Sequence, residues 1–461
     1  MVHGTVNKLF GTDGIRGVAG EYPLDTVTVE RIGRALASAL ARDLTRPPKI
    51  VIGRDTRESG PQIEKAIAQG AAGAGALIEP AGVITTPGIA FITRHESFDA
   101  GIVISASHNP YQDNGIKVFT RSGRKLSDEM ERRIEEEVAG ECADKIAKSG
   151  GGNTGETLLQ TGSRPVDYCE RYLNYLADEI GHGLDLSRMH IALDCANGAA
   201  SDIAPQLFER LKANVHRVAV SPDGRNINAN CGSTHLEGLK QSVIEQKLDL
   251  GIAFDGDADR ALLVDANGEM VDGDRMLLIL ARSMKSRGQL AGNLVVTTVM
   301  SNIGLELAFR EEGIEMLRAQ VGDRYVLEEM LARGAKLGGE QSGHIIFSDI
   351  SLAGDGMITA IEVLRALCES NRSLAELASG MKQFPQILLN VRVRSKPPIE
   401  TLPDVSAEIE RLEQDMQGRG RLLVRYSGTE NLARVMIEGE DLKTIEGQAT
   451  RLASVIERAI G

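Results

Sequence analysis

Lys49-Ile-Val-Ile-Gly-Arg-Asp55 is a short β-branched run that ends in charged residues, and a stretch with helical periodicity follows it. The same order recurs after His190-Ile-Ala-Leu-Asp-Cys195 and after Asn293-Leu-Val-Val-Thr-Thr-Val299. Strands that alternate with helical stretches are typical of α/β units built around largely parallel sheets. The three runs therefore predict three similar α/β domains, although the residues themselves repeat only weakly.

The length of the chain agrees with several domains, because 461 residues exceed what one hydrophobic core usually fills. Glycine and polar residues cluster from Lys148 to Arg164, which predicts a junction, and we expect a second boundary near Gln383-Phe384-Pro385. Beyond that boundary the pattern becomes a strand, a helix, two strands and a long helix. It predicts a small C-terminal α+β domain.

Composition excludes several classes of partner. With 52 basic and 65 acidic residues the formal net charge is −13, which argues against a nucleic-acid surface and an anionic membrane surface. Tryptophan is absent and aromatic residues make up only 3%, so stacking platforms for single strands are not expected. We therefore expect no nucleic acid and no membrane as partner, and any phosphate site must concentrate its positive charge in a cleft.

The cysteines and the apolar pattern indicate a cytoplasmic location. None of the five cysteines forms a Cys-x-x-Cys pair, so reduced thiols are expected. Met1 to Phe10 contains no apolar run of signal-peptide length, and nowhere do 18 consecutive apolar residues occur. The sequence predicts a soluble cytoplasmic protein.

The first candidate site is Ile104-Ser-Ala-Ser-His-Asn-Pro110, which follows the strand-like run 101–104. The carboxyl ends of strands are where ligands bind in α/β folds. Ser107 beside His108 has the composition of a nucleophile with a proton-handling neighbour. The alternative is a serine-rich turn shaped by Asn109 and Pro110, and the loop taken alone favours it.

The second candidate is Phe254-Asp-Gly-Asp-Ala-Asp-Arg260, between two apolar runs. Asp255, Asp257 and Asp259 alternate on one short loop, where they can converge on a hard cation such as Mg²⁺. Without a counter-ion three such carboxylates would repel one another strongly. An EF-hand is excluded because Arg260 replaces the required glycine and Ala266 the terminal glutamate. The apolar flanks favour a metal site over an acidic surface turn.

Two further loops have side chains suited to a phosphorylated sugar. Gly338-Gly-Glu-Gln-Ser-Gly-His344 alternates Glu340, Ser342 and His344, which can read sugar hydroxyls, although an ordinary turn before a strand looks similar. Arg425-Tyr-Ser-Gly-Thr-Glu-Asn-Leu-Ala-Arg434 brackets a loop of backbone and hydroxyl donors with two arginines. That combination suits a phosphate monoester, and the alternative is a hairpin with solvated arginines.

Together the four loops resemble those of the α-D-phosphohexomutase family. Leu9-Phe-Gly-Thr-Asp-Gly-Ile-Arg-Gly17 and Val321-Gly-Asp-Arg-Tyr-Val326 are similar to segments of the members that act on glucosamine phosphates. The matching segments run from residue 9 to 436 and appear in the family's order. In two departures, Tyr426 and Asn431 stand where those members commonly have proline, so the rigidity of that loop is expected to differ.

The resemblance implies three α/β domains with mixed sheets around a central cleft, plus a C-terminal α+β domain. The expected ranges are 1–160 with the phosphoserine loop, 161–266 with the metal loop, 267–380 with the sugar-binding loop and 381–461 with the phosphate-binding loop. It implies Ser107 as the phosphorylated residue, with Ser107 and the three aspartates holding Mg²⁺. The remaining residues that it places in the site are the catalytic His108, Lys117 and Arg260, and the substrate-binding Arg16, Glu340, Ser342, His344, Arg425, Ser427, Gly428, Thr429 and Arg434.

The resemblance also implies an isomerase that works through a sugar 1,6-bisphosphate, with a phosphosugar as its partner and a homodimer as its assembly. The glucosamine-type segments favour glucosamine 6-phosphate and a place in amino-sugar metabolism and peptidoglycan precursor supply. Lys117, His108 and His344 remain alternative proton-transfer groups. A mutase with another sugar preference, a metal-dependent phosphatase and a non-catalytic sugar-phosphate sensor are the competing functions.

Overall fold

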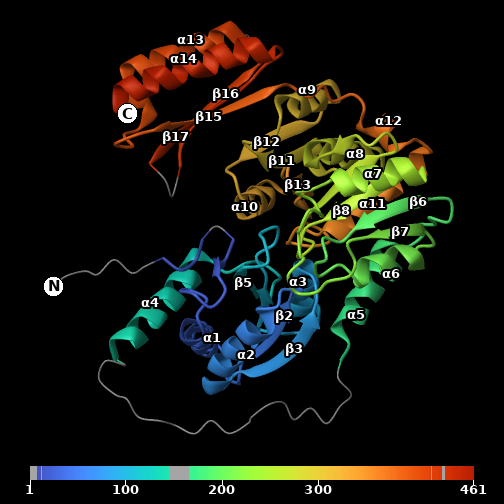
Figure 1. Cartoon of the computed structure of the whole chain (residues 1–461), viewed down its shortest axis with the longest axis vertical. Coiled ribbons are helices and arrows are strands. Elements are labelled where there is room, and N and C mark those ends of the chain that lie inside the picture. Colours follow the sequence, from blue (N-terminus) through green and yellow to red (C-terminus); the bar gives the residue numbers. More distant parts are fainter. Residues whose placement is uncertain (1–7, 12, 145–165, 417, 428–430) are drawn as a thin grey trace. The chain divides into compact units, whose positions relative to one another are not determined.

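The structure is a computed structural model that describes residues 8–11, 13–144, 166–416, 418–427 and 431–461 (Figure 1). The junction predicted at Lys148 to Arg164 lies outside these residues. The chain divides into two compact units. The first unit comprises Met1–Val299 and Met316–Ala378, and the second comprises Met300–Glu315 and Ser379–Gly461.

The first unit contains three sheets, which we call the first, second and third repeat. The first repeat has the strand order β1 (Ile15–Val18), β5 (Asp113–Thr120), β4 (Ala100–Ile104), β2 (Lys49–Arg54), β3 (Leu77–Val83). The second has the order β10 (Met270–Val271), β9 (Ala261–Asp265), β8 (Leu250–Phe254), β6 (His190–Asp194), β7 (Asn214–Val218). The third has the order β12 (Glu315–Ala319), β11 (Leu294–Thr298), β13 (Leu337–Gly339), β14 (Ile345–Phe347).

The three repeats share one pairing pattern. In each of them a parallel pair of strands, β2 with β4, β6 with β8 and β11 with β13, is followed by an antiparallel neighbour, β5, β9 or β14. The first strand of each parallel pair is the run that the sequence singled out, because β2, β6 and β11 begin at or beside Lys49, His190 and Asn293. The prediction of similar α/β domains with mixed sheets is confirmed.

Helices connect the strands of the three repeats. The close packing of α1 against α2 depends on Gly70, where an added Cβ would lie 1.8 Å from the carbonyl oxygen of Glu30. Aspartates cap several helices, as Asp25 does when its side chain accepts from the Thr28 N–H. The helices of the first unit are α1 (Thr26–Ala41), α2 (Gly60–Gly73), α3 (Thr86–His95), α4 (Asp128–Asp144), α5 (Tyr168–Asn174), α6 (Ile203–Arg210), α7 (Glu237–Gln246), α8 (Gly273–Ser286), α10 (Asp323–Arg333), α11 (Gly356–Ser370) and α12 (Leu374–Ala378).

The second unit contains an antiparallel sheet in the order β15 (Gln386–Arg392), β17 (Leu432–Glu438), β16 (Arg421–Tyr426). Helices α13 (Pro403–Met416) and α14 (Leu442–Ile460) lie on one face of it (Figure 1). Their buried side chains, among them Val405, Leu412 and Leu452, form one core with Val435 and Ile437 of β17. Helix α9 (Ile303–Glu311) belongs to this unit too. The predicted order of a strand, a helix, two strands and a helix is confirmed.

Two expectations from composition can be compared with the described residues. No helix among them is both long and apolar enough to cross a bilayer. The four cysteines whose side chains are described, Cys169, Cys195, Cys231 and Cys368, are free thiols.

The Glu438 carboxylate is buried inside the second unit and accepts hydrogen bonds there, so its removal is expected to destabilise that unit. Glu438 is 0% exposed; it accepts from Arg421 Nε at 2.9 Å and from the Ile303 N–H at 3.3 Å. Removing the carboxylate breaks a largely buried ion pair and takes an acceptor from the Ile303 N–H, at a cost of about 3 kcal/mol. We expect Glu438→Ala to lower the free energy of opening of β15, β16 and β17 by this amount, as measured by amide hydrogen exchange.

Glu440→Ala is the matched control, because its carboxylate is 47% exposed and pairs with Lys382 at 3.3 Å on the surface. Such surface pairs contribute about 0–1 kcal/mol. Equal protection factors in the two variants would show that Glu438 stabilises the sheet no more than the surface residue Glu440 does.

Candidate active site

Three of the four sequence motifs occupy the same position in the three repeats. The loop with Ser107 joins β4 to β5, the acidic loop joins β8 to β9, and the loop with Glu340 joins β13 to β14. Each loop therefore leaves the carboxyl end of a strand that has a parallel neighbour and returns along an antiparallel one. All three lie in the first unit, and the acidic loop contacts the other two through Ser107 and His344.

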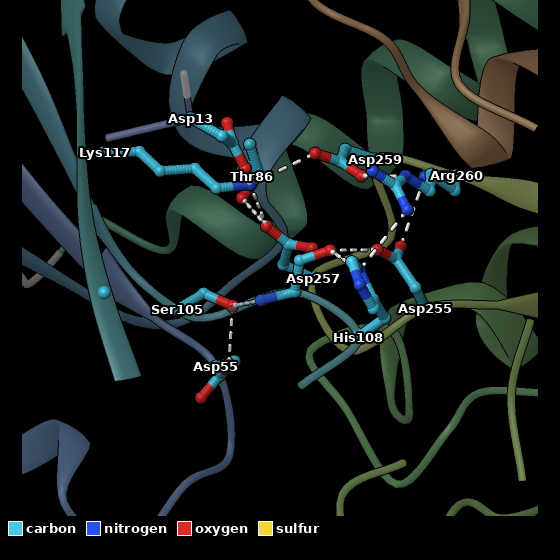
Figure 2. Close-up of polar contacts among 12 residues, drawn as sticks. Asp13, Asp55, Thr86, Ser105, His108, Lys117, Asp255, Asp257, Asp259 and Arg260 are labelled. Atoms are coloured by element: carbon cyan, nitrogen blue, oxygen red, sulfur yellow. Dashed lines mark hydrogen bonds and ion pairs between the residues drawn. The ribbon is translucent and has the colours of Figure 1, made fainter. Parts of the chain in front are cut away.

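The Ser107 side chain points at the acidic loop. Its Oγ donates to Asp255 Oδ2 at 2.5 Å and lies 3.3 Å from His108 Nδ1, and the residue is 1% exposed. The Ser107 N–H donates to Ser105 Oγ, whose hydroxyl donates to Asp55 Oδ2 at 2.6 Å (Figure 2). Ser105 is thus committed to a structural bond, and Ser107 is the serine that faces the carboxylates.

The three aspartates converge as the alternation of the motif predicted. Asp255, Asp257 and Asp259 are 1%, 0% and 5% exposed, and each offers a carboxylate oxygen within 4.8 Å of the others. Burial and the neighbouring charges of Asp259 and Asp257 raise the pKa of Asp255 well above its usual value. Burial acts in the same direction on Asp259, but the ammonium group of Lys117 holds the pKa of that carboxyl well below its usual value.

Lys117 supplies positive charge to the acidic loop from β5. Its Nζ lies 2.8 Å from Asp257 Oδ2, 3.2 Å from Asp259 Oδ2 and 3.3 Å from Asp13 Oδ2 (Figure 2). Burial alone would lower its pKa, but these carboxylates raise it well above the usual value. Lys117 therefore carries a positive charge at neutral pH, and it shares this charge among Asp257, Asp259 and Asp13.

The remaining negative charge fits a bound divalent cation. Asp257 Oδ1 is buried and has no hydrogen-bond partner among the described residues, and Asp259 Oδ1 has only the longer contacts to His344 Nδ1 at 3.7 Å and to Arg260 Nε at 3.8 Å. Buried carboxylate oxygens without donors are costly unless a cation binds them. Oxygen ligands on one rigid loop suit hard cations. The cluster of Asp255, Asp257 and Asp259 can therefore hold a metal ion, with Ser107 Oγ beside it.

Arg260 and His108 lie on the side of Asp255. The backbone N–H of Arg260 donates to Asp255 Oδ1 at 3.2 Å, and the Arg260 side-chain Nη1 lies 3.3 Å from His108 Nδ1. Burial, together with the charges of Arg260 and Arg16, lowers the pKa of His108. Arg16 belongs to β1, and its Nη1 donates to Asn109 Oδ1 at 3.4 Å. These residues, predicted as site residues, are brought together around Ser107.

The loop of the third repeat is a turn, closed by the Gly343 N–H on the Glu340 carbonyl at 3.0 Å. Ser342 is consequently exposed and bonded to Glu340 Oε2 at 3.3 Å, whereas His344 is only 4% exposed. His344 Nδ1 lies 3.7 Å from Asp259 Oδ1, which links the loop at 340–344 to the acidic loop. Burial opposes the charged form of His344, but Asp259 raises its pKa overall.

A chain of charges joins the two glucosamine-type segments to the site. Lys125 Nζ pairs with Asp13 of the first segment and, at 2.6 Å, with Asp323 of the second. Asp323 Oδ2 lies 3.6 Å from His344 Nε2, and the Gly322 N–H donates to Glu340 Oε1 at 3.1 Å. The segment at 321–326 thus supports the loop that was predicted to read the sugar.

The loop predicted to bind phosphate lies in the second unit, between β16 and β17. Arg425 and Arg434 are register partners on these antiparallel strands, so their side chains leave the same face of the sheet. Burial and the charge of Arg434 lower the pKa of Arg425. An anion bound between the two arginines would raise this pKa again. Ser427 is buried at the start of the loop, whereas Gly428 and Thr429 lie outside the described residues.

The departures from proline in this loop have a structural counterpart. The Tyr426 hydroxyl donates to the Pro397 carbonyl at 2.7 Å, and Lys396 Nζ donates to the Ser427 carbonyl at 2.7 Å. The Val393 N–H donates to the Asn431 carbonyl at 3.0 Å. The segment 393–397 therefore ties both ends of the loop, which replaces part of the restraint that proline would provide.

Several residues of the site were not found from the sequence. Arg57 and Asp55 form a fully buried ion pair at 2.9 Å behind the Ser107 loop, and Asn228 contacts that loop from the second repeat. Thr86 donates its hydroxyl to Asp257 Oδ2. Asp55 and Arg57 follow a β-branched run at a strand's carboxyl end, which is the signal that singled out Ser107. Asn228 has no such signal.

Comparison with known proteins agrees with this geometry. Sequence profiles for the phosphoglucomutase/phosphomannomutase α/β/α domains I, II and III match residues 7–144, 170–268 and 272–384, and the profile of the C-terminal domain matches 388–455. The chain belongs to the phosphoglucomutase/phosphomannomutase family, the α-D-phosphohexomutases.

A phosphoglucosamine mutase of Solibacter usitatus is 50% identical to the chain over 453 residues, which cover 98% of this chain and 99% of that one. A family member from Burkholderia thailandensis has a similar structure, with a TM-score of 0.77, 24% identity and 98% of both chains covered. The N-acetylphosphoglucosamine mutase of Aspergillus fumigatus, solved with GlcNAc-6P and magnesium, has a TM-score of 0.64 at 16% identity, with 98% and 96% covered. These two structures support the fold.

Proposed function

We propose that the chain interconverts glucosamine 6-phosphate and glucosamine 1-phosphate, which is the phosphoglucosamine mutase reaction. The observation that carries the proposal is the Ser107 hydroxyl, 2.5 Å from a carboxylate of the buried aspartate cluster. A hydroxyl aimed at a candidate metal site is the arrangement that a phosphoryl carrier needs. The sugar preference rests on the name of the full-length relatives and on the segments at 9–17 and 321–326.

In the proposed reaction Ser107 is phosphorylated in the resting enzyme. The O1 hydroxyl of the 6-phosphosugar attacks the phosphorus, so that the bond from phosphorus to Ser107 Oγ breaks as the bond to O1 forms. A proton leaves O1 and Ser107 Oγ gains one. The sugar 1,6-bisphosphate turns around in the site, and Ser107 Oγ attacks the phosphorus of its 6-phosphoryl group. The bond from phosphorus to O6 breaks as the bond to Ser107 Oγ forms, Oγ loses its proton and O6 gains one, which leaves glucosamine 1-phosphate and phosphorylated Ser107. The same bisphosphate serves as activator when Ser107 is bare.

Positioning and charge stabilisation supply most of the rate in such a transfer. Asp255, Asp257 and Asp259 would hold Mg²⁺ together with Ser107, and the bound cation offsets charge on the phosphoryl oxygens. The guanidinium group of Arg260, with its Nε 3.8 Å from Asp259 Oδ1, and the ammonium group of Lys117 add positive charge beside the cluster. Three side chains beside the cluster can hold the transferred proton: His108, Lys117 and His344.

Recognition of the sugar falls to the other two loops. Glu340, Ser342 and His344 would bind sugar hydroxyls, while Arg16 lies beside Asn109 at the serine loop. Arg425, Ser427, Gly428, Thr429 and Arg434 would hold the phosphate that does not react, in both orientations of the intermediate. Because Arg425 and Arg434 face each other on adjacent strands, a phosphate bound between them would relieve the repulsion between their charges.

A comparison of substrates tests the proposal. Purified protein with Mg²⁺ and a catalytic amount of sugar 1,6-bisphosphate is given glucosamine, glucose or mannose 6-phosphate, and the 1-phosphates are quantified. We expect the highest kcat/KM with glucosamine 6-phosphate. Preference for mannose or glucose phosphate would move the chain to another branch of the family. Release of inorganic phosphate in place of a 1-phosphate would make it a phosphatase.

Arg434→Ala is expected to raise KM for glucosamine 6-phosphate and for glucosamine 1-phosphate alike, by about 10- to 100-fold. Hydrogen bonds to a charged group contribute about 1.5–3 kcal/mol, and the arginine would contact the unreacted phosphate of either isomer. Steady-state kinetics in both directions measure this. Arg419→Ala is the control, since that arginine is 67% exposed. An effect on one isomer only would contradict a shared phosphate site.

The proposal includes a cytoplasmic location and a homodimer, as the family resemblance implies. Glucosamine 1-phosphate would then feed the synthesis of UDP-N-acetylglucosamine for the cell wall. Light scattering of the purified chain checks the assembly. A monomer at micromolar concentration would remove the homodimer from the proposal and leave the reaction unchanged.

A further inference from the structure

The Ser107 loop is held in a conformation that a serine rarely adopts. The φ angle of Ser107 is 54°, in the left-handed region, which costs an L-residue about 1–2 kcal/mol. Such a conformation persists only when the surrounding structure over-determines it. The side chains that hold the backbone of this loop are therefore part of the arrangement that aims the Ser107 hydroxyl.

Arg57 holds the loop from within the first repeat. Its side chain is 0% exposed and pairs with Asp55 at 2.9 Å. Its Nη2 donates to the carbonyl oxygens of Ser107 and Asn109, both at 2.9 Å, and its Nη1 donates to those of Pro110 and Asp113. One guanidinium group thus binds four backbone carbonyls of the loop.

Asn228 holds the same loop from the second repeat. Its Nδ2 donates to the carbonyl oxygens of Ser107 and Asn109, both at 2.9 Å, and the residue is 7% exposed. Gly256 permits this approach, because an added Cβ would lie 2.5 Å from the Ser107 carbonyl oxygen and 3.0 Å from Asn228 Nδ2. The glycine of the acidic loop and Asn228 therefore make one contact surface for the serine loop.

The two carbonyls have both of their lone pairs occupied. A carbonyl oxygen accepts up to two hydrogen bonds, and those of Ser107 and Asn109 each receive one from Arg57 and one from Asn228. The negative ends of these dipoles are therefore directed at Arg57 and Asn228. The doubly charged phosphoryl group proposed on Ser107 Oγ then meets less repulsion from its own loop.

We infer that Asn228 is a positioning residue for phosphoryl transfer, which keeps Ser107 Oγ aimed at the aspartate cluster by binding the carbonyls of Ser107 and Asn109. The inference rests on the proposed function, since it concerns the same serine. It also assigns a part of the site to a segment of the second repeat, 224–228, that lies outside every motif of the sequence analysis.

Asn228 is a better test than Arg57, because removing Arg57 would leave Asp55 as an uncompensated buried charge and endanger folding. Asn228→Asp keeps the shape of the side chain, and aspartate, like asparagine, tolerates the φ of 58° at this position. The substitution replaces the Nδ2 donor with a carboxylate oxygen. Asn230→Asp is the matched control. Asn230 lies in the same loop with a φ of 54°, and its side chain is exposed.

We expect Asn228→Asp to lower kcat by about 10- to 100-fold, the loss that a small misplacement of a reacting group causes. KM for the sugar monophosphate should stay close to that of the wild type, because the binding residues are unchanged. The ³¹P resonance of phosphoserine 107 should shift, and Asn228→Gly, which removes the donor without adding charge, should lose less kcat than Asn228→Asp. Asn230→Asp should match the wild type in every readout.

Two results would overturn the inference. One is a kcat for both Asn228 variants equal to that of Asn230→Asp. The other is a loss of kcat that follows a lower thermal midpoint with an unmoved ³¹P resonance, which would make Asn228 a structural residue only. Failure of the proposed function looks different, because wild type and Asn230→Asp would then also neither take up phosphate from a sugar 1,6-bisphosphate nor turn over. That result would overturn both the proposed function and the role inferred for Asn228.

Discussion

Ser107→Ala is expected to lower mutase turnover by at least about 10⁴-fold, the order of loss that follows removal of a covalent nucleophile. The neighbouring hydroxyl cannot replace it, because Ser105 Oγ donates to Asp55 and accepts from the Ser107 N–H. The fold should persist, since the substitution removes only the contacts of one hydroxyl, with Asp255 and His108, each worth about 1 kcal/mol. Kinetics on glucosamine 6-phosphate measure the loss, and circular dichroism checks the fold.

Mass spectrometry connects the kinetic loss to the covalent step. Wild-type protein treated with a sugar 1,6-bisphosphate should gain one phosphate, located on the peptide that contains Ser107. Ser107→Ala should gain none, whereas Ser122→Ala, a change at an exposed serine, should behave as the wild type does. Undiminished turnover in Ser107→Ala would exclude the phosphoserine mechanism and return attention to a sensor or a phosphatase.

Removal of the metal is expected to have the second largest effect. Chelation should abolish turnover and added Mg²⁺ should restore it, while Asp257→Asn should lose that restoration. Asp257 Oδ2 is already bound by Lys117 at 2.8 Å and by the Thr86 hydroxyl, whereas the buried Oδ1 has no hydrogen-bond partner in the described part of the chain. The carbonyl oxygen of the asparagine amide can still accept from Lys117 and Thr86. Its NH₂ group then replaces Oδ1, where a cation needs an oxygen.

We expect the turnover of Asp257→Asn at saturating substrate to fall by about 10²- to 10³-fold, as when one preorganised charge is lost from a transition-state site. Titration with Mn²⁺, followed by electron paramagnetic resonance, measures metal binding without catalysis. Asp178→Asn at an exposed position is the control for a lost carboxylate. Wild-type Mn²⁺ affinity in Asp257→Asn would place the metal elsewhere.

The loops that bear the chemistry could be predicted because each is continuous in sequence and directly follows a strand. Ser107 and the aspartates of 255–259 lie at the carboxyl ends of β4 and β8, where the α/β pattern directs ligands. The alternation at 255, 257 and 259 survives folding because residues so close in the chain have few ways to separate. The same reasoning does not extend to the loop at 340–344, where a turn leaves Ser342 exposed and His344 buried.

The sequence alone thus determined the α/β repeats, the order of the C-terminal elements and the three loops of the first unit, because strand and helix periods and loop chemistry are local properties. Only the tertiary structure decided which side chains orient those loops. Arg57 and Asn228 reach the Ser107 carbonyl from positions 50 and 121 residues away, and Lys125 reaches Asp323 across 198. Hydrogen bonds to backbone carbonyls are available to many side chains and have no spacing rule, so they become visible only when the repeats are packed together.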